Sequence, residues 1–268
     1  MSLRIQNNVE AFNAHRNLQA VSDKVSQSME RLSSGYRINR AADDAAGLAI
    51  SEKMRAQIRG LGQDQRNIQD GVSLVQTAEG ALSTVHDMLQ RVRELAVQFK
   101  NGSLSASNQS AIQSEVYQLA SEIERIGNST KFNGISLLNN TNTVTFQVGA
   151  NDGEQIGIAM VSLGAAVGSS YFNLTTTGTT DISNIDTAID SVSSQRAALG
   201  AVQNRLQYSL DNVGIYQENL VAAESRIRDV DMAEETVSLT KNQILAQAGT
   251  AMLAQANQAG QGVLSLLH

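Results

Sequence analysis

The sequence has no cysteine, no proline and no tryptophan, and aromatic residues make up only 4% of its 268 residues. Without cysteine, disulfides, thiolate catalysis and cysteine-bound zinc are excluded. The few aromatics, together with abundant Ala, Gln, Ser and Asn, favour long helices over the compact core of an enzyme. We therefore expect a rod or a helical bundle that is stabilised by packing alone.

Basic stripes and long apolar runs are also missing. The formal net charge is −6 and the pI is near 5.1, which argues against a nucleic-acid partner. No stretch reaches the roughly 18 apolar residues of a membrane span. The first twenty residues lack the apolar centre of a secretory signal. We expect no membrane insertion and no cleaved signal peptide.

What is present is helical periodicity, first seen from residue 5. Apolar residues recur there mostly at spacings of three and four, which is typical of one helical face. The helix is expected to end near Gly35, because glycine readily adopts the left-handed conformation that closes helices. The apolar positions of this face are Ile5, Val9, Phe12, Leu18, Val21, Val25, Met29 and Leu32.

A second helical pattern starts after Asp43 and Asp44 and becomes a strict heptad seam from Leu74 to Phe99, widened by a second apolar row. After the break "KNGSLSAS", residues 112 to 126 repeat the seam, which predicts an antiparallel partner helix. The seam comprises Leu74, Ala78, Ala81, Val85, Met88, Val92, Leu95 and Phe99. The second row comprises Val75, Leu82, Leu89 and Ala96.

Between about 129 and 165 the period changes to two, which predicts β-strands. "KFNGISLL" contains an Asn-Gly turn signal, and the alternation on either side of "ANDGE" predicts a β-hairpin near 143–161. Residues 164–184 are expected to form a loop, because "GAAVGSSYFNLTTTGTT" is rich in Gly, Ser and Thr.

Helical periodicity resumes at Ile185 and continues almost to the C-terminus. A terminal helix of about 30 residues cannot bury its apolar stripe alone, so we expect the two terminal helices to pair. Even paired, they would leave apolar surface for other copies of the chain. The fold class is therefore mainly α: a long antiparallel helical bundle or coiled coil, with paired N- and C-terminal helices and a small β-hairpin region.

Several ordered segments resemble the bacterial flagellins. They begin with "MERLSSGYRINRAADDAAGLAISEKMRAQIRGL" and continue with "QDGVSLVQTAEGALSTVHDMLQRVRELAVQ", "SSQRAALGAVQNRL", "AAESRIRDVDMAEE" and "AMLAQANQ". The resemblance covers nearly everything except about 164–184. It implies an extracellular subunit of the flagellar filament, secreted by the flagellar export apparatus.

The resemblance also implies a layered organisation. Residues 1–44 and 235–268 would form an inner core with its connector, and residues 45–163 and 185–234 an outer core. Residues 164–184 replace the large surface domains of many flagellins. Polymerisation contacts are expected at Ile5, Val9, Phe12, Leu18, Val25, Leu32, Ile244, Met252, Leu264 and Leu267. The usual proline after "AQANQ" is absent, and Gly260 stands there instead.

Candidate catalytic and metal sites have simpler interpretations. Asp43 and Asp44 are adjacent carboxylates, but no nucleophile accompanies them, so one is expected to cap the next helix. The three histidines, His15, His86 and His268, are widely separated in sequence and form no metal-ligand motif. We predict no enzymatic activity, no metal and no cofactor.

The segment "QRVREL" has two interpretations. From the residues alone it is a solvated helix face with Arg91 near Glu94. The resemblance implies recognition by the vertebrate Toll-like receptor for flagellin through Gln90, Arg91, Glu94, Leu95 and Glu115. It also implies an export chaperone on the C-terminal helix, and filament cap and junction proteins as partners.

Two alternatives remain open from the sequence. The hook-filament junction protein shares similar termini but differs through the middle, where "QRVRELAVQ" favours the filament. A chemoreceptor-like signalling protein shares the sustained heptads, but it predicts helix throughout.

Overall fold

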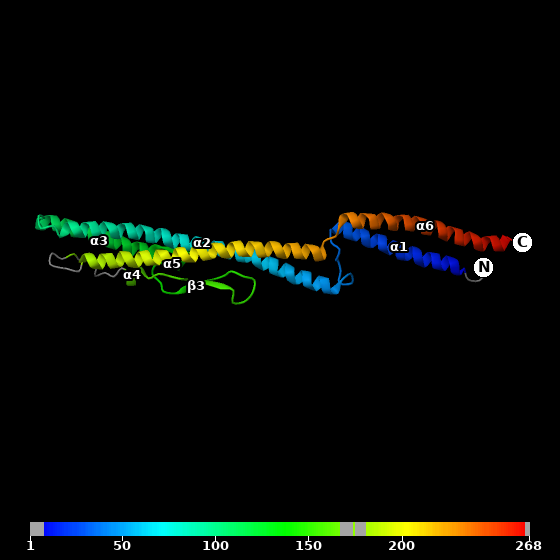
Figure 1. Ribbon diagram of the computed structural model, residues 1–268, viewed down its shortest axis with the longest axis horizontal. Coiled ribbons are helices and arrows are strands. Elements are labelled where there is room, and N and C mark those ends of the chain that lie inside the picture. Colours follow the sequence, from blue (N-terminus) through cyan, green and yellow to red (C-terminus); the bar gives the residue numbers. More distant parts are fainter. Residues whose placement is uncertain (1–7, 167–173, 175–180, 266–268) are drawn as a thin grey trace. The chain divides into compact units, whose positions relative to one another are not determined.

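The computed structural model describes residues 8–166, 174 and 181–265 (Figure 1). The chain divides into two compact units. The first contains residues 1–56 and 219–268, and the second contains residues 57–218. The divisions fall inside two long helices, α2 (Ala45–Phe99) and α5 (Asp181–Arg228), so each helix contributes to both units.

In the first unit, α1 (Val9–Ser34) lies antiparallel beside α6 (Met232–Ser265), as Figure 1 shows. Asn8 caps α1 by accepting a hydrogen bond from the backbone N–H of Ala11 at 3.0 Å. Gly35 ends the helix with a φ of 75°, the left-handed conformation predicted for it. The expected pairing of the terminal helices is therefore confirmed.

The second unit is a bundle of α2, α5 and α3 (Ala106–Ser129), which lie side by side in Figure 1. The second apolar row of α2 is entirely inaccessible, since Val75, Leu82, Leu89 and Ala96 are all 0% exposed. Because the heptad seam beside it is also largely buried, α2 packs against neighbours on two sides. Fully burying a valine or leucine side chain stabilises the bundle by about 1.5–3 kcal/mol.

Two small antiparallel sheets follow α3. β1 (Lys131–Phe132) pairs with β2 (Ile135–Ser136). Between them Asn133 and Gly134 have φ values of 47° and 82°, the left-handed pair that an Asn-Gly turn provides. β3 (Thr143–Gln147) pairs with β4 (Gln155–Ala159), with Phe146 opposite Ile156. The predicted mainly helical fold with a small β-hairpin is confirmed.

The segment expected to be a loop at 164–184 contains regular structure at both ends. A short helix, α4 (Leu163–Ala166), occupies its start, and α5 begins at Asp181, four residues before the apolar pattern resumes at Ile185. The apolar spacing did not predict the first turn of α5, because most residues of that turn are polar. Leu174 is 5% exposed and its N–H donates to the Gln113 side chain at 3.1 Å.

Candidate assembly surface

The predicted terminal stripe divides into two sets of side chains. Leu18, Val25 and Leu32 are half-buried, and α1 and α6 approach closely where Leu18 meets Gly249. A side chain added at Gly249 would begin 3.2 Å from Leu18 Cδ1, so glycine permits this approach. Leu18 thus joins the two helices within one subunit.

The other set is exposed on the same two helices. Val9 and Phe12 of α1 are 55% and 72% exposed, and Ile244 and Met252 of α6 are 60% and 65% exposed. Val237 and Leu245 of α6 are exposed as well. We call this set the terminal apolar surface. Exposed apolar side chains gathered on one pair of helices are typical of a protein interface. Ile5, Leu267 and the side chain of Leu264 lie outside the described residues.

Polar contacts between α1 and α6 fix the register of the two helices. The Asn8 amide donates to the carbonyl of Ala256 at 2.8 Å, and the Arg31 guanidinium lies 3.6 Å from the Glu235 carboxylate. Asn242 is a further buried polar residue of α6. Contacts near both ends of α1 therefore set one alignment of the pair.

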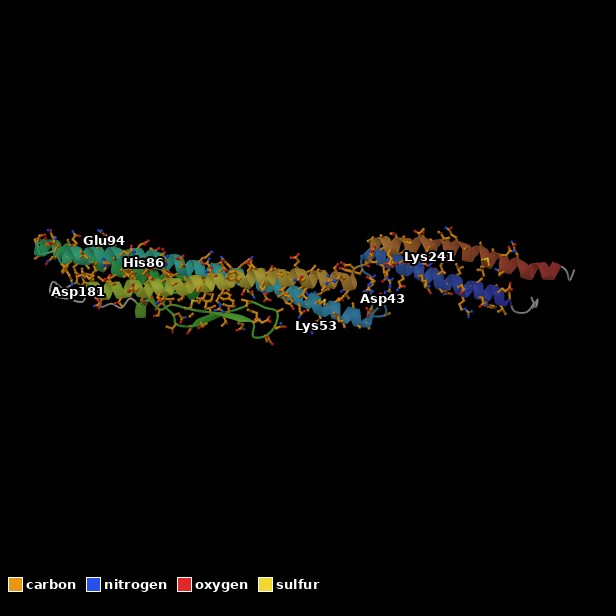
Figure 2. The ribbon with its side chains drawn as sticks, in the orientation of Figure 1. Asp43, Lys53, His86, Glu94, Asp181 and Lys241 are labelled. Atoms are coloured by element: carbon orange, nitrogen blue, oxygen red, sulfur yellow. The ribbon has the colours of Figure 1, made fainter. Side chains whose placement is uncertain are left out.

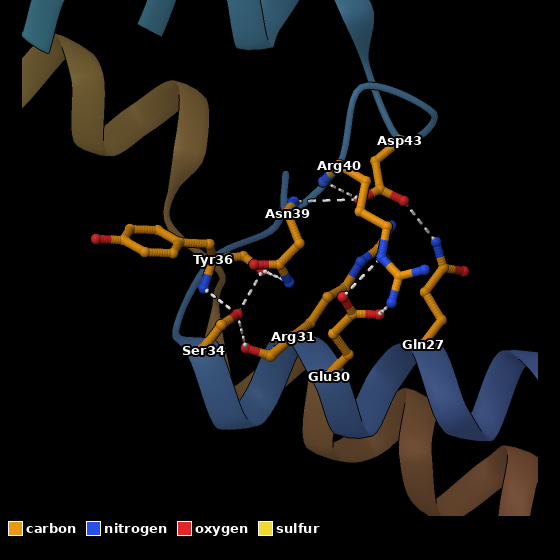
Figure 3. A network of polar contacts seen from close by, with 8 residues as sticks. All are labelled: Gln27, Glu30, Arg31, Ser34, Tyr36, Asn39, Arg40 and Asp43. Carbon is orange, nitrogen blue, oxygen red and sulfur yellow. Dashed lines mark hydrogen bonds and ion pairs between the residues drawn. The ribbon is translucent and has the colours of Figure 1, made fainter. Parts of the chain in front are cut away.

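The connector between α1 and α2 is folded back on α1 (Figure 3). Asp43 Oδ2 accepts from the backbone N–H groups of Asn39 and Arg40 at 3.1 and 3.0 Å, while its Oδ1 accepts from Gln27 at 3.0 Å. The Arg40 backbone bond is the main cause that lowers the pKa of Asp43. Figure 3 also shows the bidentate pair between Arg40 and Glu30.

Asp44 has the other expected role. Its Oδ1 accepts from the N–H of Gly47 at 2.8 Å, which satisfies a free donor at the start of α2. The predicted cap is confirmed, and Asp44 is the residue that provides it. The neighbouring Asp43 instead closes the connector.

The start of the connector is also tied to the end of α5 within the first unit. Arg37 N–H donates to the Arg228 carbonyl at 2.7 Å, and Val230 N–H donates to the Gly35 carbonyl at 3.0 Å. The Arg228 guanidinium stacks 4.8 Å from the Tyr36 ring centroid. The segment that follows α1 and the segment that follows α5 thus pair in one short antiparallel contact.

Ion pairs connect α2 to its neighbours in the second unit. Arg91 contacts Glu115 of α3 at 3.0 Å and Glu94 of α2 at 3.0 Å, and these bonds raise its pKa. Arg93 contacts Asp186 of α5 at 2.6 Å. Gln90, Arg91, Glu94 and Glu115 are exposed, and Figure 2 labels Glu94 on α2. They form what we call the Arg91 surface.

Leu95 does not belong to that surface. It is 2% exposed, because it occupies the heptad seam that packs into the bundle. This burial agrees with the seam position predicted for it, and its expected role in receptor recognition stays a prediction.

Metal and membrane features are absent from the parts of the chain that the structure describes. Among the described residues, no three or more His, Cys, Asp or Glu side chains gather to hold a metal ion. No described helix is long and apolar enough to cross a membrane.

Comparison with known proteins shows where such an arrangement occurs. Residues 5–143 match the bacterial flagellin N-terminal helical region, and residues 182–267 match the bacterial flagellin C-terminal helical region. A flagellin of Halalkalibacterium halodurans is 53% identical, with 98% of this chain and 99% of that protein covered. The flagellin of Bacillus subtilis is 48% identical, with 99% and 100% covered. The chain belongs to the bacterial flagellins.

Further relatives agree with this membership. The flagellar filament 33 kDa core protein of Treponema phagedenis is 50% identical, with 98% of this chain and 99% of that protein covered. The crystal structure of Bacillus cereus flagellin matches with a TM-score of 0.52 and 33% identity, covering 55% of this chain and 88% of that one. This flagellin is therefore a flagellar filament subunit, and the family is one of structural proteins, consistent with our prediction that it is not an enzyme.

Sequence reasoning did not identify every residue of this flagellin's contacts. Tyr36, Arg37 and Arg228 meet although about 190 residues separate them, and no local pattern reveals such a pairing. The division of the terminal stripe into buried and exposed sets was also not predicted. The buried and the exposed residues follow the same apolar spacing in the sequence. Only the packing of α1 against α6 shows which of them are buried.

Proposed function

We propose that this flagellin polymerises by burying its terminal apolar surface against other copies of the chain. The observation that carries the proposal is the exposure of Phe12 and Ile244, which lie on paired helices yet contact solvent over 72% and 60% of their surface. Burying apolar area gives roughly 25 cal/mol per Å². Repeated along a helical polymer, this gain favours the filament over the monomer.

Within the filament, the layers implied by the resemblance remain part of this proposal. Residues 1–44 and 235–268 would form the inner layer, and residues 45–163 and 185–234 the outer layer. The folded connector supports this division, because Asp43 and Arg40 hold residues 35–44 as a defined segment between helices. Association with filament cap and junction proteins would follow at the ends of the polymer.

Polymerisation is tested by changing exposed apolar side chains without disturbing the helix pair. Phe12→Gln and Ile244→Gln would be added to sheared filament seeds and examined by electron microscopy and sedimentation. We expect filament yield to fall strongly while the helical circular dichroism stays unchanged. Asn17→Gln, an exposed polar position of α1, is the matched control and should polymerise normally. Wild-type yield from both apolar variants would contradict the proposal.

The same surface of α6 supports a role before assembly. Val237, Ile244, Leu245 and Met252 are exposed there, an apolar row that a monomer must keep covered to avoid aggregation. We propose that an export chaperone covers α6 until the chain leaves the cell through the flagellar export apparatus. Chaperone binding that survives deletion of residues 235–268 would refute this role.

We further propose that the Arg91 surface of the monomer is recognised by the vertebrate Toll-like receptor for flagellin. Arg91 is held in place by Glu115 and Glu94, so its guanidinium is presented in one orientation. Arginine is enriched among the residues that contribute most of the binding free energy of protein interfaces.

Receptor recognition is tested with monomers in a receptor reporter assay. Arg91→Ala should weaken signalling about tenfold or more, equivalent to about 1.4 kcal/mol of binding free energy. Arg93→Ala is the matched control, because Arg93 is an exposed arginine of the same helix that pairs with Asp186 instead. Unchanged signalling by a folded Arg91→Ala monomer would remove this function.

A further inference from the structure

A buried carboxylate lies beneath the loop that joins β3 to β4. One turn before it on α2, Gly60 faces the loop, since a side chain added there would begin 3.3 Å from Ala150 Cβ. One turn after it, the Asn67 amide donates to the Gln147 carbonyl at 3.3 Å. Asp64 lies between these two contacts on the same helical face and is therefore covered by the loop.

The Asp64 carboxylate lacks the contacts that a buried charge requires. The residue is 4% exposed, and its Oδ2 atom is buried without a hydrogen-bond partner among the described residues. In a charged carboxylate at this position, the Oδ2 atom has lost water without gaining a replacement among the described residues. A proton on the carboxyl group removes that buried charge.

The groups around Asp64 do not neutralise it. From the loop, Glu154 adds a second negative charge, and Asp152 is exposed. From α5, Gln217 faces this part of α2 and is uncharged. On α2 itself, Arg66 is exposed and bonds to Gln63. The charged residues of α5 along this stretch are all exposed: Arg205, Asp211 and Glu218.

The loop above Asp64 is fastened internally as one piece. Glu154 accepts from the Asn151 backbone N–H at 3.1 Å and from its side-chain amide at 3.2 Å. The Gln147 amide donates to the carbonyls of Gly149 and Asn151 at 2.6 and 2.7 Å. These bonds do not involve α2, so they can persist when the loop moves away from the helix, whereas the bond from Asn67 to the Gln147 carbonyl must then break.

We propose that a proton on Asp64 helps to hold this loop on α2: protonating the buried carboxyl group stabilises the covered position of the loop, and losing that proton loosens the loop. Burial is the main cause that raises the pKa of Asp64 above its ordinary value of 3.8, and the Glu154 charge adds to it. The covered state therefore binds more protons than the uncovered one. Its stability is highest below pH 3.8 and falls as the pH rises through the raised pKa.

The test is a pH titration of the monomer followed by NMR. The side-chain carboxyl carbon of Asp64 reports its own ionisation, and the amide signals of Val148 and Ala150 report the position of the loop. We expect Asp64 to titrate above 3.8 and the two amide signals to move with the same midpoint. Glu154→Gln should lower that midpoint, because it removes the neighbouring negative charge.

Substitutions separate Asp64 from the other carboxylates. Asp64→Asn imitates the protonated form and should abolish the titration of the loop, whereas Asp152→Asn, an exposed acidic residue of the same loop, should preserve it. Asp64→Ala is the second variant if the amide disturbs folding. Asp64 titrating at or below 3.8, or a loop titration that persists in Asp64→Asn, would overturn the proposal. So would a loop that responds to Mg²⁺ or Ca²⁺ at constant pH, since a cation would then balance the charge.

Discussion

At the scale of single residues, two adjacent aspartates have different tasks in the connector. Asp44 caps α2 through one hydrogen bond to Gly47, which any of several polar residues provides at a helix start. Asp43 accepts three hydrogen bonds from Asn39, Arg40 and Gln27. A substitution at Asp43 is therefore expected to loosen the connector rather than the helix.

We predict that Asp43→Ala speeds amide exchange at Asn39 and Arg40, because both N–H groups lose their acceptor. Net hydrogen bonds to charged groups contribute about 1.5–3 kcal/mol, reduced here by solvent access, so we expect roughly 1 kcal/mol and about fivefold faster exchange. Hydrogen exchange followed by NMR at neutral pH measures this. Asp23→Asn, an exposed aspartate of α1, is the control, and equal exchange in both variants would contradict the prediction.

The same site predicts a direction for the effect of acid. The folded pKa of Asp43 lies below its unfolded value of 3.8, so the folded connector binds fewer protons. Its stabilisation is complete above pH 3.8 and is lost as the pH falls through the lowered folded value. The difference in thermal midpoint between wild type and Asp43→Asn should therefore shrink in acid. A difference that grows at low pH would show the opposite linkage.

At the scale of helices and strands, the sequence predicted the elements better than their contacts. Heptad spacing located the buried rows of α2, and the Asn-Gly pair located the β1–β2 turn, because both signals are local. The burial of Asp64 was not predicted. Whether a polar residue is buried depends on elements distant in sequence: Asp64 lies under a loop some 85 residues away, since its neighbour Gly60 faces Ala150.

The contact between α1 and α6 depends on a small residue at Gly249. We predict that Gly249→Leu separates the helices, because overpacking costs about 1–3 kcal/mol and exceeds the gain of up to about 1 kcal/mol in helix propensity. The thermal midpoint of the helical circular dichroism should fall. Gln247→Leu introduces the same side chain at an exposed position and should leave the midpoint nearly unchanged. A higher midpoint for Gly249→Leu would mean that Leu18 moves aside without cost.

At the scale of the whole molecule, this flagellin exposes large apolar residues on the helices at both ends of the chain, since the α1 and α6 pair leaves Phe12, Val237 and Met252 exposed. The second unit also exposes Tyr208 and Ile215 of α5, but it buries the apolar rows of α2 within one subunit. The second unit is thus expected to fold alone, and the terminal pair is expected to be completed by copies. Deleting residues 241–268 separates these roles.

We predict that a chain ending before Lys241, which Figure 2 labels on α6, forms no filaments even with seeds, because it lacks Ile244 and Met252 and leaves most of α1 without its partner. The helical signal of residues 57–218 should persist, since its buried rows lie outside the deletion. Electron microscopy with and without sheared seeds, beside the full chain, measures the difference. Seeded filaments from the truncated chain would place the polymerisation contacts in the second unit. Failure of the folded, seeded full chain to polymerise would show that the exposed terminal apolar surface is not sufficient for assembly.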